Sequence, residues 1–246
     1  IVGLARQSGW QQAAVVGVPV TADPPQVGGL SPSAIFPVTF ADGTGRTRPA
    51  DLDFPVVGMS DVMPYPSSVW SGLSATQLDQ YRQVWRGHLT RVIREFQPDV
   101  IHANHVWLMS SLLRGIAPGT PLVVTCHATG LRQMNLCPRL ANEVIAGCRH
   151  INHFCALRQD HRTQLAGFLD IPENRISVVG VGFRDDIFYL NPEIAPEPGN
   201  LIYVGKFSRA KGLPWLLDAV EELHCRGRQV VLHVAGDGAG AEAESL

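Results

Sequence analysis

Residues 201–212 read Leu-Ile-Tyr-Val-Gly-Lys-Phe-Ser-Arg-Ala-Lys-Gly, and the fold class follows from them. The first four residues are apolar and rich in β-formers, which predicts a buried strand ending at Gly205. Gly212 precedes an apolar-periodic segment that predicts a helix, and Pro214 suits its first turn because no amide partner is lost there. A strand followed by a glycine-bounded turn and a helix predicts an α/β unit.

The turn itself carries three cations, Lys206, Arg209 and Lys211. Unpaired N–H groups and the dipole at a helix N-terminus favour anions, so this pattern indicates a site for a phosphate or a diphosphate. A solvated basic loop is the alternative interpretation. The spacing is neither that of a Walker loop nor a Gly-x-Gly-x-x-Gly fingerprint.

The composition is that of an ordinary globular protein. With 246 residues, 45% hydrophobic and 17% charged, the chain predicts one large or two modest domains. A net charge of −2 argues against nucleic acid as the main partner. No apolar run is long enough for a transmembrane span, although peripheral membrane contact stays open. An odd number of cysteines without a Cys-x-x-Cys pair favours reduced thiols and a cytoplasmic location: Cys126, Cys137, Cys148, Cys155 and Cys225.

Strand-like and helix-like segments alternate along the chain. The expected strands cover residues 13–19, 35–40, 54–58, 100–103, 121–126, 150–156, 176–180, 201–204 and 229–235. The expected helices cover residues 74–96, 108–113, 138–146 and 159–168, and another helix begins at about residue 213. Continuous apolar strands between helices predict a parallel, doubly wound sheet, in which ligands gather at the carboxyl ends of strands. His102, His105, His127 and the basic turn all fall at such ends, so we expect them to line one cleft.

Several segments, in order along the chain, resemble the motifs of the retaining GT-B glycosyltransferases of glycosyltransferase family four (glycosyl transferases group 1). The basic turn is similar to the family's nucleotide-sugar signature, with Lys206 where arginine is usual. That exchange keeps the charge but loses the planar bidentate fork. The other similar segments are residues 98–105, 121–127, 181–188 and 234–238.

The resemblance implies a GT-B-like fold, with two Rossmann-like, doubly wound parallel-sheet domains facing a cleft and truncated at both ends. Residues 1–183 would form the acceptor-side domain without its first strand, and residues 184–246 the start of the nucleotide-sugar-binding domain. The implied activity is retaining transfer of a hexosyl or other glycosyl group from a nucleotide-diphosphate sugar, such as a UDP-sugar, to a hydroxyl. The acceptor would be a carbohydrate, a lipid-linked molecule or a small molecule.

The resemblance also assigns roles to residues. His127 would face the donor sugar, and Lys206 and Lys211 would neutralise the diphosphate, so that these three residues are catalytic and no metal or other cofactor is expected. The donor would lie against Gly205, Lys206, Arg209, Lys211, Gly236 and Gly238. His105, with Thr129 and Gly130 on a loop after His127, would meet the acceptor. The open alternatives are a satisfied buried histidine at position 127, a structural role for His102, and an ordinary strand-to-helix turn at the two distal glycines.

Two patterns suggest a metal but are weak. Asp51-Leu52-Asp53 is formally a D-x-D motif, yet it lies in a loop-like segment. Cys148, His150, His153 and Cys155 would point to opposite faces of a strand, which disfavours four-fold coordination.

The resemblance is incomplete. The family's Glu-x7-Glu segment is absent after Gly238, as is the glycine-rich loop after its first strand, so we expect the chain to hold only part of a donor site and to be inactive in this form. A GT-B-fold sugar-nucleotide epimerase or phosphorylase is one alternative function, and a non-catalytic sugar-nucleotide-binding or partner-binding fragment is another.

Overall fold

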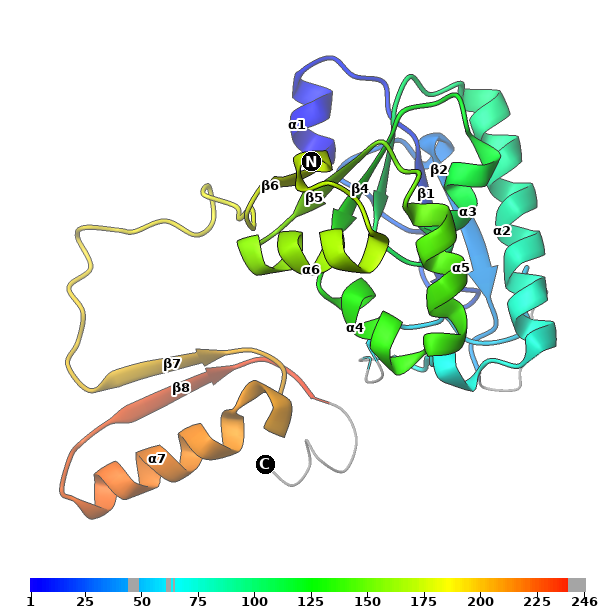
Figure 1. Cartoon of the computed structure of the whole chain (residues 1–246). Coiled ribbons are helices and arrows are strands. Elements are labelled where there is room, and N and C mark those ends of the chain that lie inside the picture. The colour runs from blue at the N-terminus through cyan, green and yellow to red at the C-terminus, as the bar shows by residue number, and fades with distance from the viewer. Residues whose placement is uncertain (44–48, 61–62, 64, 239–246) are drawn as a thin grey trace. The chain divides into compact units, whose positions relative to one another are not determined.

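The computed structural model describes residues 1–43, 49–60, 63 and 65–238. The chain divides into two compact units, Ile1–Val181 and Gly182–Leu246, and each is described by itself. Both are α/β units whose strands pair in parallel, so the predicted parallel α/β fold class is confirmed (Figure 1).

Among its described residues, the first unit contains two parallel sheets. A two-stranded sheet pairs β1 (Ala14–Pro19) with β2 (Ile35–Phe40). A four-stranded sheet follows the order of the chain: β3 (Ile101–Asn104), β4 (Leu122–Cys126), β5 (His153–Ala156) and β6 (Ile176–Val178). Because parallel crossovers are right-handed, a sheet built in sequential order receives its connecting helices on one face.

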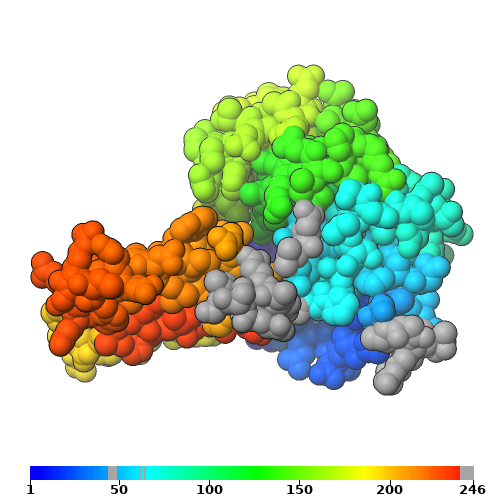
Figure 2. Space-filling model, turned by 90° about the horizontal axis from the view of Figure 1, so that it is seen from below, coloured from blue at the N-terminus to red at the C-terminus, as the bar shows by residue number. Residues whose placement is uncertain are grey.

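The α-helices described in this unit are α1 (Val2–Gln7), α2 (Ala75–Phe96), α3 (Leu108–Ile116), α4 (Thr129–Leu136), α5 (Pro138–Cys148) and α6 (Gln159–Leu169). Short 3-10 turns occur at Pro32–Ala34, Trp70–Gly72 and Glu173–Arg175. Helix α3 packs against both α2 and α5, and Figure 2 shows the cyan and green segments that contain these helices side by side.

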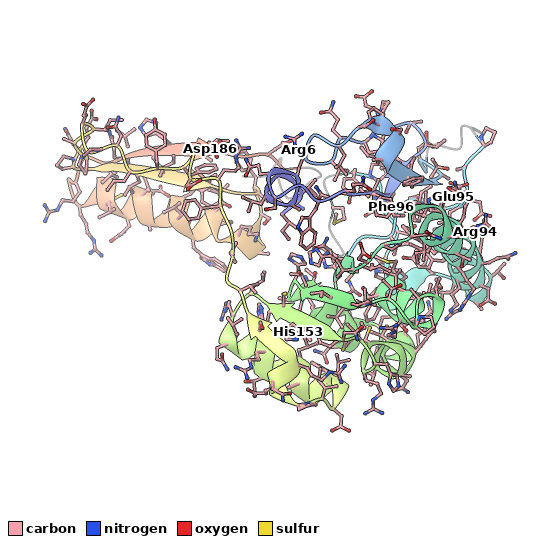
Figure 3. The ribbon with its side chains drawn as sticks, turned by 90° about the horizontal axis from the view of Figure 1, so that it is seen from above. Arg6, Arg94, Glu95, Phe96, His153 and Asp186 are labelled. Carbon is pink, nitrogen blue, oxygen red and sulfur yellow. The ribbon has the colours of Figure 1, made fainter. Side chains whose placement is uncertain are left out.

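Helix α2 forms where its apolar periodicity predicts it. Ser74 and Gln77 make a reciprocal capping box at its start, and Gln97 ends it in a left-handed conformation. The apolar stripe faces the core, as expected for an amphipathic helix; its buried members are Leu78, Tyr81, Trp85, Leu89 and Val92. Figure 3 labels Arg94, Glu95 and Phe96 in the last turn.

The two faces of the four-stranded sheet differ in chemistry. Ala103, Val124, Phe154 and Ile176 are register partners across all four strands, and all of them are buried in the core. The next row consists of Asn104, Thr125, Cys155 and Ser177, which therefore belong to the opposite face. His153, labelled in Figure 3, shares that polar face. Strands β3 and β5 thus alternate in burial, whereas β4 is buried or half-buried at every position.

Two expected strands are shorter or absent. Residues 54–58 contribute only an isolated bridge between Val57 and Ser68 instead of a strand. Strand β5 begins at His153 rather than at residue 150, because helix α5 extends to Cys148 and a turn follows it. Both differences arise where prolines or an extended helix occupy residues that an apolar pattern alone assigns to a strand.

The described residues of the second unit form a strand–helix–strand repeat. Strand β7 (Asn200–Val204) pairs in parallel with β8 (Val231–Ala235), and α7 (Leu213–Cys225) connects them and lies alongside the pair (Figure 1). A 3-10 turn, η4 (Arg209–Lys211), separates β7 from α7. Residues 182–199 precede β7 without a helix or a strand, which agrees with their proline content.

Candidate functional site

Two histidines of the first unit meet at the edge of the four-stranded sheet where β3 and β4 end. Strands β3 and β4 are parallel neighbours, so their carboxyl ends lie together, and the residues that follow are His105 and His127. Their ring centroids are 5.0 Å apart, with an angle of 50° between the ring planes. We call these two rings, with Asn104 and Thr129, the imidazole cluster.

Hydrogen bonds connect the members of the imidazole cluster. Nε2 of His127 lies 3.0 Å from Oδ1 of Asn104, and Nδ1 of His105 lies 3.1 Å from Oγ1 of Thr129. The same Thr129 hydroxyl donates to the carbonyl oxygen of His127 at 2.7 Å. Next to the cluster, Nε2 of His102 lies 2.8 Å from the hydroxyl of the buried Thr125. Each imidazole is therefore held in place by a polar partner.

His105 has a strained backbone conformation. Its φ angle is 68°, in the left-handed region that a non-glycine residue rarely adopts. Neighbouring hydrogen bonds hold it there, because the His105 amide donates to the Thr125 carbonyl at 3.0 Å and the Ser110 hydroxyl donates to the His105 carbonyl at 2.7 Å. Residues held this way cluster at functional sites, where the strain is a cost that the surrounding structure must offset.

Thr129 and Gly130 lie at the start of a helix, and the expectation of a loop here was wrong. Helix α4 begins at Thr129, which brings its hydroxyl next to both histidines. A Cβ at the buried Gly130 would lie 2.7 Å from the Val106 carbonyl oxygen, closer than real Cβ contacts. A glycine is needed at this position because α4 approaches the backbone that follows His105. This packing gives Gly130 a structural role, and its contact with an acceptor stays a prediction.

The imidazoles of the cluster are neutral at physiological pH. Burial, with a smaller contribution from the His127 charge, lowers the pKa of His105 from 6.5 to about 4. Burial also lowers the pKa of His127, and burial together with His127 lowers the pKa of His102. Neutral imidazole can both donate and accept a hydrogen bond, so this edge suits polar uncharged groups such as hydroxyls.

The basic turn of the second unit is tied to the end of β8. The Gly205 amide donates to the Ala235 carbonyl at 3.0 Å, and the Phe207 amide donates to the Asp237 carbonyl at 2.9 Å. The Tyr203 hydroxyl donates to the Lys206 carbonyl at 2.7 Å. The backbone of the turn is therefore fixed.

The structure explains why glycine is needed at two positions of this region. A Cβ at Gly236 would overlap the Gly205 carbonyl group. Gly212 has a φ of 81°, a left-handed conformation in which it both ends η4 and caps α7. These reasons apply whether or not a nucleotide binds here, and the donor-site roles predicted for Gly205, Gly236 and Gly238 stay predictions.

The cations of the turn differ in exposure. Lys206 is half-buried, whereas Arg209 and Lys211 are exposed. Lys206 and Lys211 are also the only two lysines among the 20 basic Lys and Arg residues of the whole chain. Because η4 intervenes, α7 starts at Leu213, so Arg209 and Lys211 lie within the turn just before the helix N-terminus.

The other candidate metal patterns have ordinary structural uses. One carboxylate oxygen of Asp51 accepts from both the amide and the hydroxyl of Thr39 at 2.7 Å. Cys148 is buried at the end of α5, whereas His153 and Cys155 lie on β5. Within the described ranges, no group of three or more His, Cys, Asp or Glu side chains is arranged to hold a metal ion.

Sequence reasoning did not select Asn104 as a site residue. It lies at the last position of β3, directly before His105, and its amide reaches His127 on the neighbouring strand end. The sequence signal that could have selected Asn104 is its position between a predicted strand and His105. The pairing with His127 depends on the register of β3 with β4, which the sequence does not reveal.

Comparison with known families identifies the class of protein. The model of Glycosyltransferase Family 4 matches residues 49–186, more than half of the chain and the part that contains the imidazole cluster. The chain belongs to Glycosyltransferase Family 4, as its motifs indicated, and this membership supports glycosyl transfer as its chemistry.

The solved structures that match this chain are distant from it in sequence. The structure described as trehalose-6-phosphate from E. coli bound with UDP-2-fluoro glucose has a TM-score of 0.52 at 13% identity, covering 95% of this chain and 67% of that one. UDP-N-acetylglucosamine 2-epimerase from Rickettsia bellii gives 0.38 at 11% identity, covering 96% and 65%. A glycosyltransferase from Rickettsia africae ESF-5 gives 0.42 at 10% identity, covering 96% and 71%. The chain thus spans about two thirds of the length of these structures.

The search among curated proteins gave no match. In the part of the chain that the structure describes, no helix combines the length and apolar character needed to cross a membrane.

The lowered histidine pKa values predict an acid-sensitive fold. Between pH 6.5 and about 4, His105 binds more protons in the unfolded chain than in the folded one. The contribution of neutral His105 to the free energy of unfolding is therefore fully present above pH 6.5 and is lost as the pH falls. Replacing His105 with Asn, which tolerates the left-handed backbone, should reduce the fall in unfolding free energy between pH 7 and pH 5. Urea titrations at both pH values measure the free energy of unfolding. An equal loss of this free energy in the variant and in the wild type would refute the lowered pKa of His105.

The contact between Gly236 and Gly205 predicts a local effect of substitution. Gly236→Ala places a methyl group on the Gly205 carbonyl, so the hydrogen bonds from the Gly205 and Phe207 amides should weaken. Hydrogen exchange of residues 203–207 should accelerate by at least about tenfold, the equivalent of ~1.4 kcal/mol. Gly182→Ala is the matched control, because a methyl group added there would meet no heavy atom within 4 Å. Equal exchange in both variants would contradict the close contact.

Proposed function

We propose that the chain is the acceptor-side and partial donor-side portion of a retaining glycosyltransferase that uses a nucleotide-diphosphate sugar. The observation that carries the proposal is the imidazole cluster at the carboxyl ends of β3 and β4, within the residues that match Glycosyltransferase Family 4. Parallel α/β sheets bind ligands at this edge. In this proposal His127 contacts the donor sugar and His105 lies on the acceptor side.

The two lysines of the second unit are the diphosphate ligands in this proposal. A nucleoside diphosphate is a leaving group that gains negative charge as the glycosidic bond breaks, and preorganised cations stabilise that charge. The fixed backbone at Gly205 and Lys206 favours such preorganisation. Lys206 and Lys211 would bind the diphosphate, with Arg209 and the start of α7 adding positive potential. A resident metal is then not required.

The magnitudes limit what the lysines contribute. A charge-assisted hydrogen bond contributes about 1.5–3 kcal/mol, or roughly 10- to 100-fold in rate. Enzymes lower barriers by about 8–23 kcal/mol, so positioning of the donor and the acceptor must supply much of the remainder. This need for positioning agrees with a site in which each imidazole is held by a hydrogen-bonding partner.

The scarcity of lysine allows a direct binding test. In this chain an amine-reactive reagent such as acetic anhydride finds only Lys206, Lys211 and the α-amino group. UDP, GDP or ADP should slow acetylation of both lysines by roughly tenfold and leave the α-amino group unchanged, as read by peptide mass spectrometry. The α-amino group is the internal control. Equal acetylation with and without all three nucleotides would exclude the lysines from a diphosphate site.

An activity test addresses the reaction itself in the longer protein. With UDP-, GDP- or ADP-glucose and a sugar acceptor, we expect acceptor-dependent release of nucleoside diphosphate and a product with the donor's anomeric configuration, which NMR reads. Lys211→Ala should nearly abolish turnover, whereas Lys211→Arg, which keeps the charge, should retain more of it.

The other candidate functions give different results in the same assay. Turnover of the donor without an acceptor would favour an epimerase, and dependence on orthophosphate would favour a phosphorylase. Nucleotide binding without any turnover would favour a non-catalytic binding fragment. Wild-type kinetics in Lys211→Ala would refute the role given to that lysine.

A further inference from the structure

The Thr129 hydroxyl determines which nitrogen of His105 carries the proton. Oγ1 of Thr129 contacts the His127 carbonyl oxygen at 2.7 Å and Nδ1 of His105 at 3.1 Å. A carbonyl oxygen can only accept, so the single hydroxyl proton is used in that bond. Nδ1 of His105 must then be the donor to Oγ1. In neutral His105 the proton is therefore on Nδ1, and Nε2 has the lone pair.

A separate contact determines the tautomer of His127. Its Nε2 lies 3.0 Å from the amide oxygen of Asn104, which can only accept a hydrogen bond. The His127 proton is therefore on Nε2, and Nδ1 has the lone pair. The two rings hold opposite tautomers, although they lie next to each other at 5.0 Å between centroids. The lowered pKa values of both histidines agree with this neutral pair.

We propose that Thr129 and Asn104 are positioning residues that fix opposite tautomers on His105 and His127, so that the pair offers two uncharged acceptors to hydroxyl groups. The acceptors are Nε2 of His105 and Nδ1 of His127. A lone pair on neutral imidazole attracts an O–H donor and gives no charge attraction to a phosphate. The ligand class at the imidazole cluster is therefore a neutral sugar or alcohol. This inference rests on the proposed function for its substrate, but its test does not require turnover.

The tautomers can be read directly. We would label the histidines of the 246-residue chain with 15N and record long-range 1H–15N correlations at about pH 7.5, where imidazole with its ordinary pKa is neutral. Protonated and unprotonated ring nitrogens give separate signals. In the wild-type chain, His105 should show a protonated Nδ1 and His127 a protonated Nε2. The opposite result for either ring would overturn the assignment for that ring.

Matched variants test the positioning residues. Thr129→Val removes the hydroxyl and should shift His105 toward the other tautomer, whereas Thr129→Ser keeps the hydroxyl and should preserve the wild-type signals. Asn104→Ala should release His127 in the same way, whereas Asn104→Asp keeps an oxygen acceptor, so the proton should stay on Nε2 while the carboxylate raises the pKa of His127. An unchanged tautomer in Thr129→Val or Asn104→Ala would refute that residue's role. If Thr129→Val or Asn104→Ala does not fold, the spectra of the wild type, Thr129→Ser and Asn104→Asp test the proposal.

A final arm tests the ligand class with named probes. Glucose should perturb the unprotonated nitrogen signals of His105 and His127, whereas inorganic phosphate should leave them unchanged. Perturbation by phosphate, or by neither probe, would overturn the hydroxyl assignment. If the tautomers are as predicted but the longer protein transfers no glycosyl group, only the proposed function is refuted.

Discussion

Parallel pairing of β3 with β4 is the interaction on which the candidate site depends. The register sets Asn104 opposite Thr125, so both strands deliver their next residues to the same edge. The buried row that includes Ala103, Val124 and Phe154 fixes this register, because a shift by one residue would turn apolar side chains to the polar face. Burial in the core therefore places His105 and His127 beside each other, although neither ring is part of the core.

Near His105 and His127, the backbone is strained and closely packed. His105 has a left-handed backbone, and Gly130 lets α4 approach the Val106 carbonyl. Both features bring the Thr129 hydroxyl to the His105 ring. Such local costs persist where neighbouring contacts over-determine the geometry.

The second unit is also a parallel α/β unit, but its turn after β7 presents basic side chains instead of imidazoles. Its βαβ repeat fixes a basic turn through Tyr203, Gly205 and Gly236, and it concentrates both lysines of the chain there. The first unit offers neutral hydrogen-bonding groups, whereas the second offers cations.

The sequence by itself determined the parallel α/β class, the bounds of α2 and of most strands, and the family, because apolar periodicity, capping residues and ordered motifs are local properties. It also selected His105, His127 and the basic turn, since strand ends are readable from apolar runs. Only the tertiary structure decided that Asn104 and Thr129 hold the two imidazoles, that α4 begins at Thr129, and that one face of the sheet is polar. Those features depend on strand register and on hydrogen bonds between residues more than twenty positions apart, which local pattern does not encode.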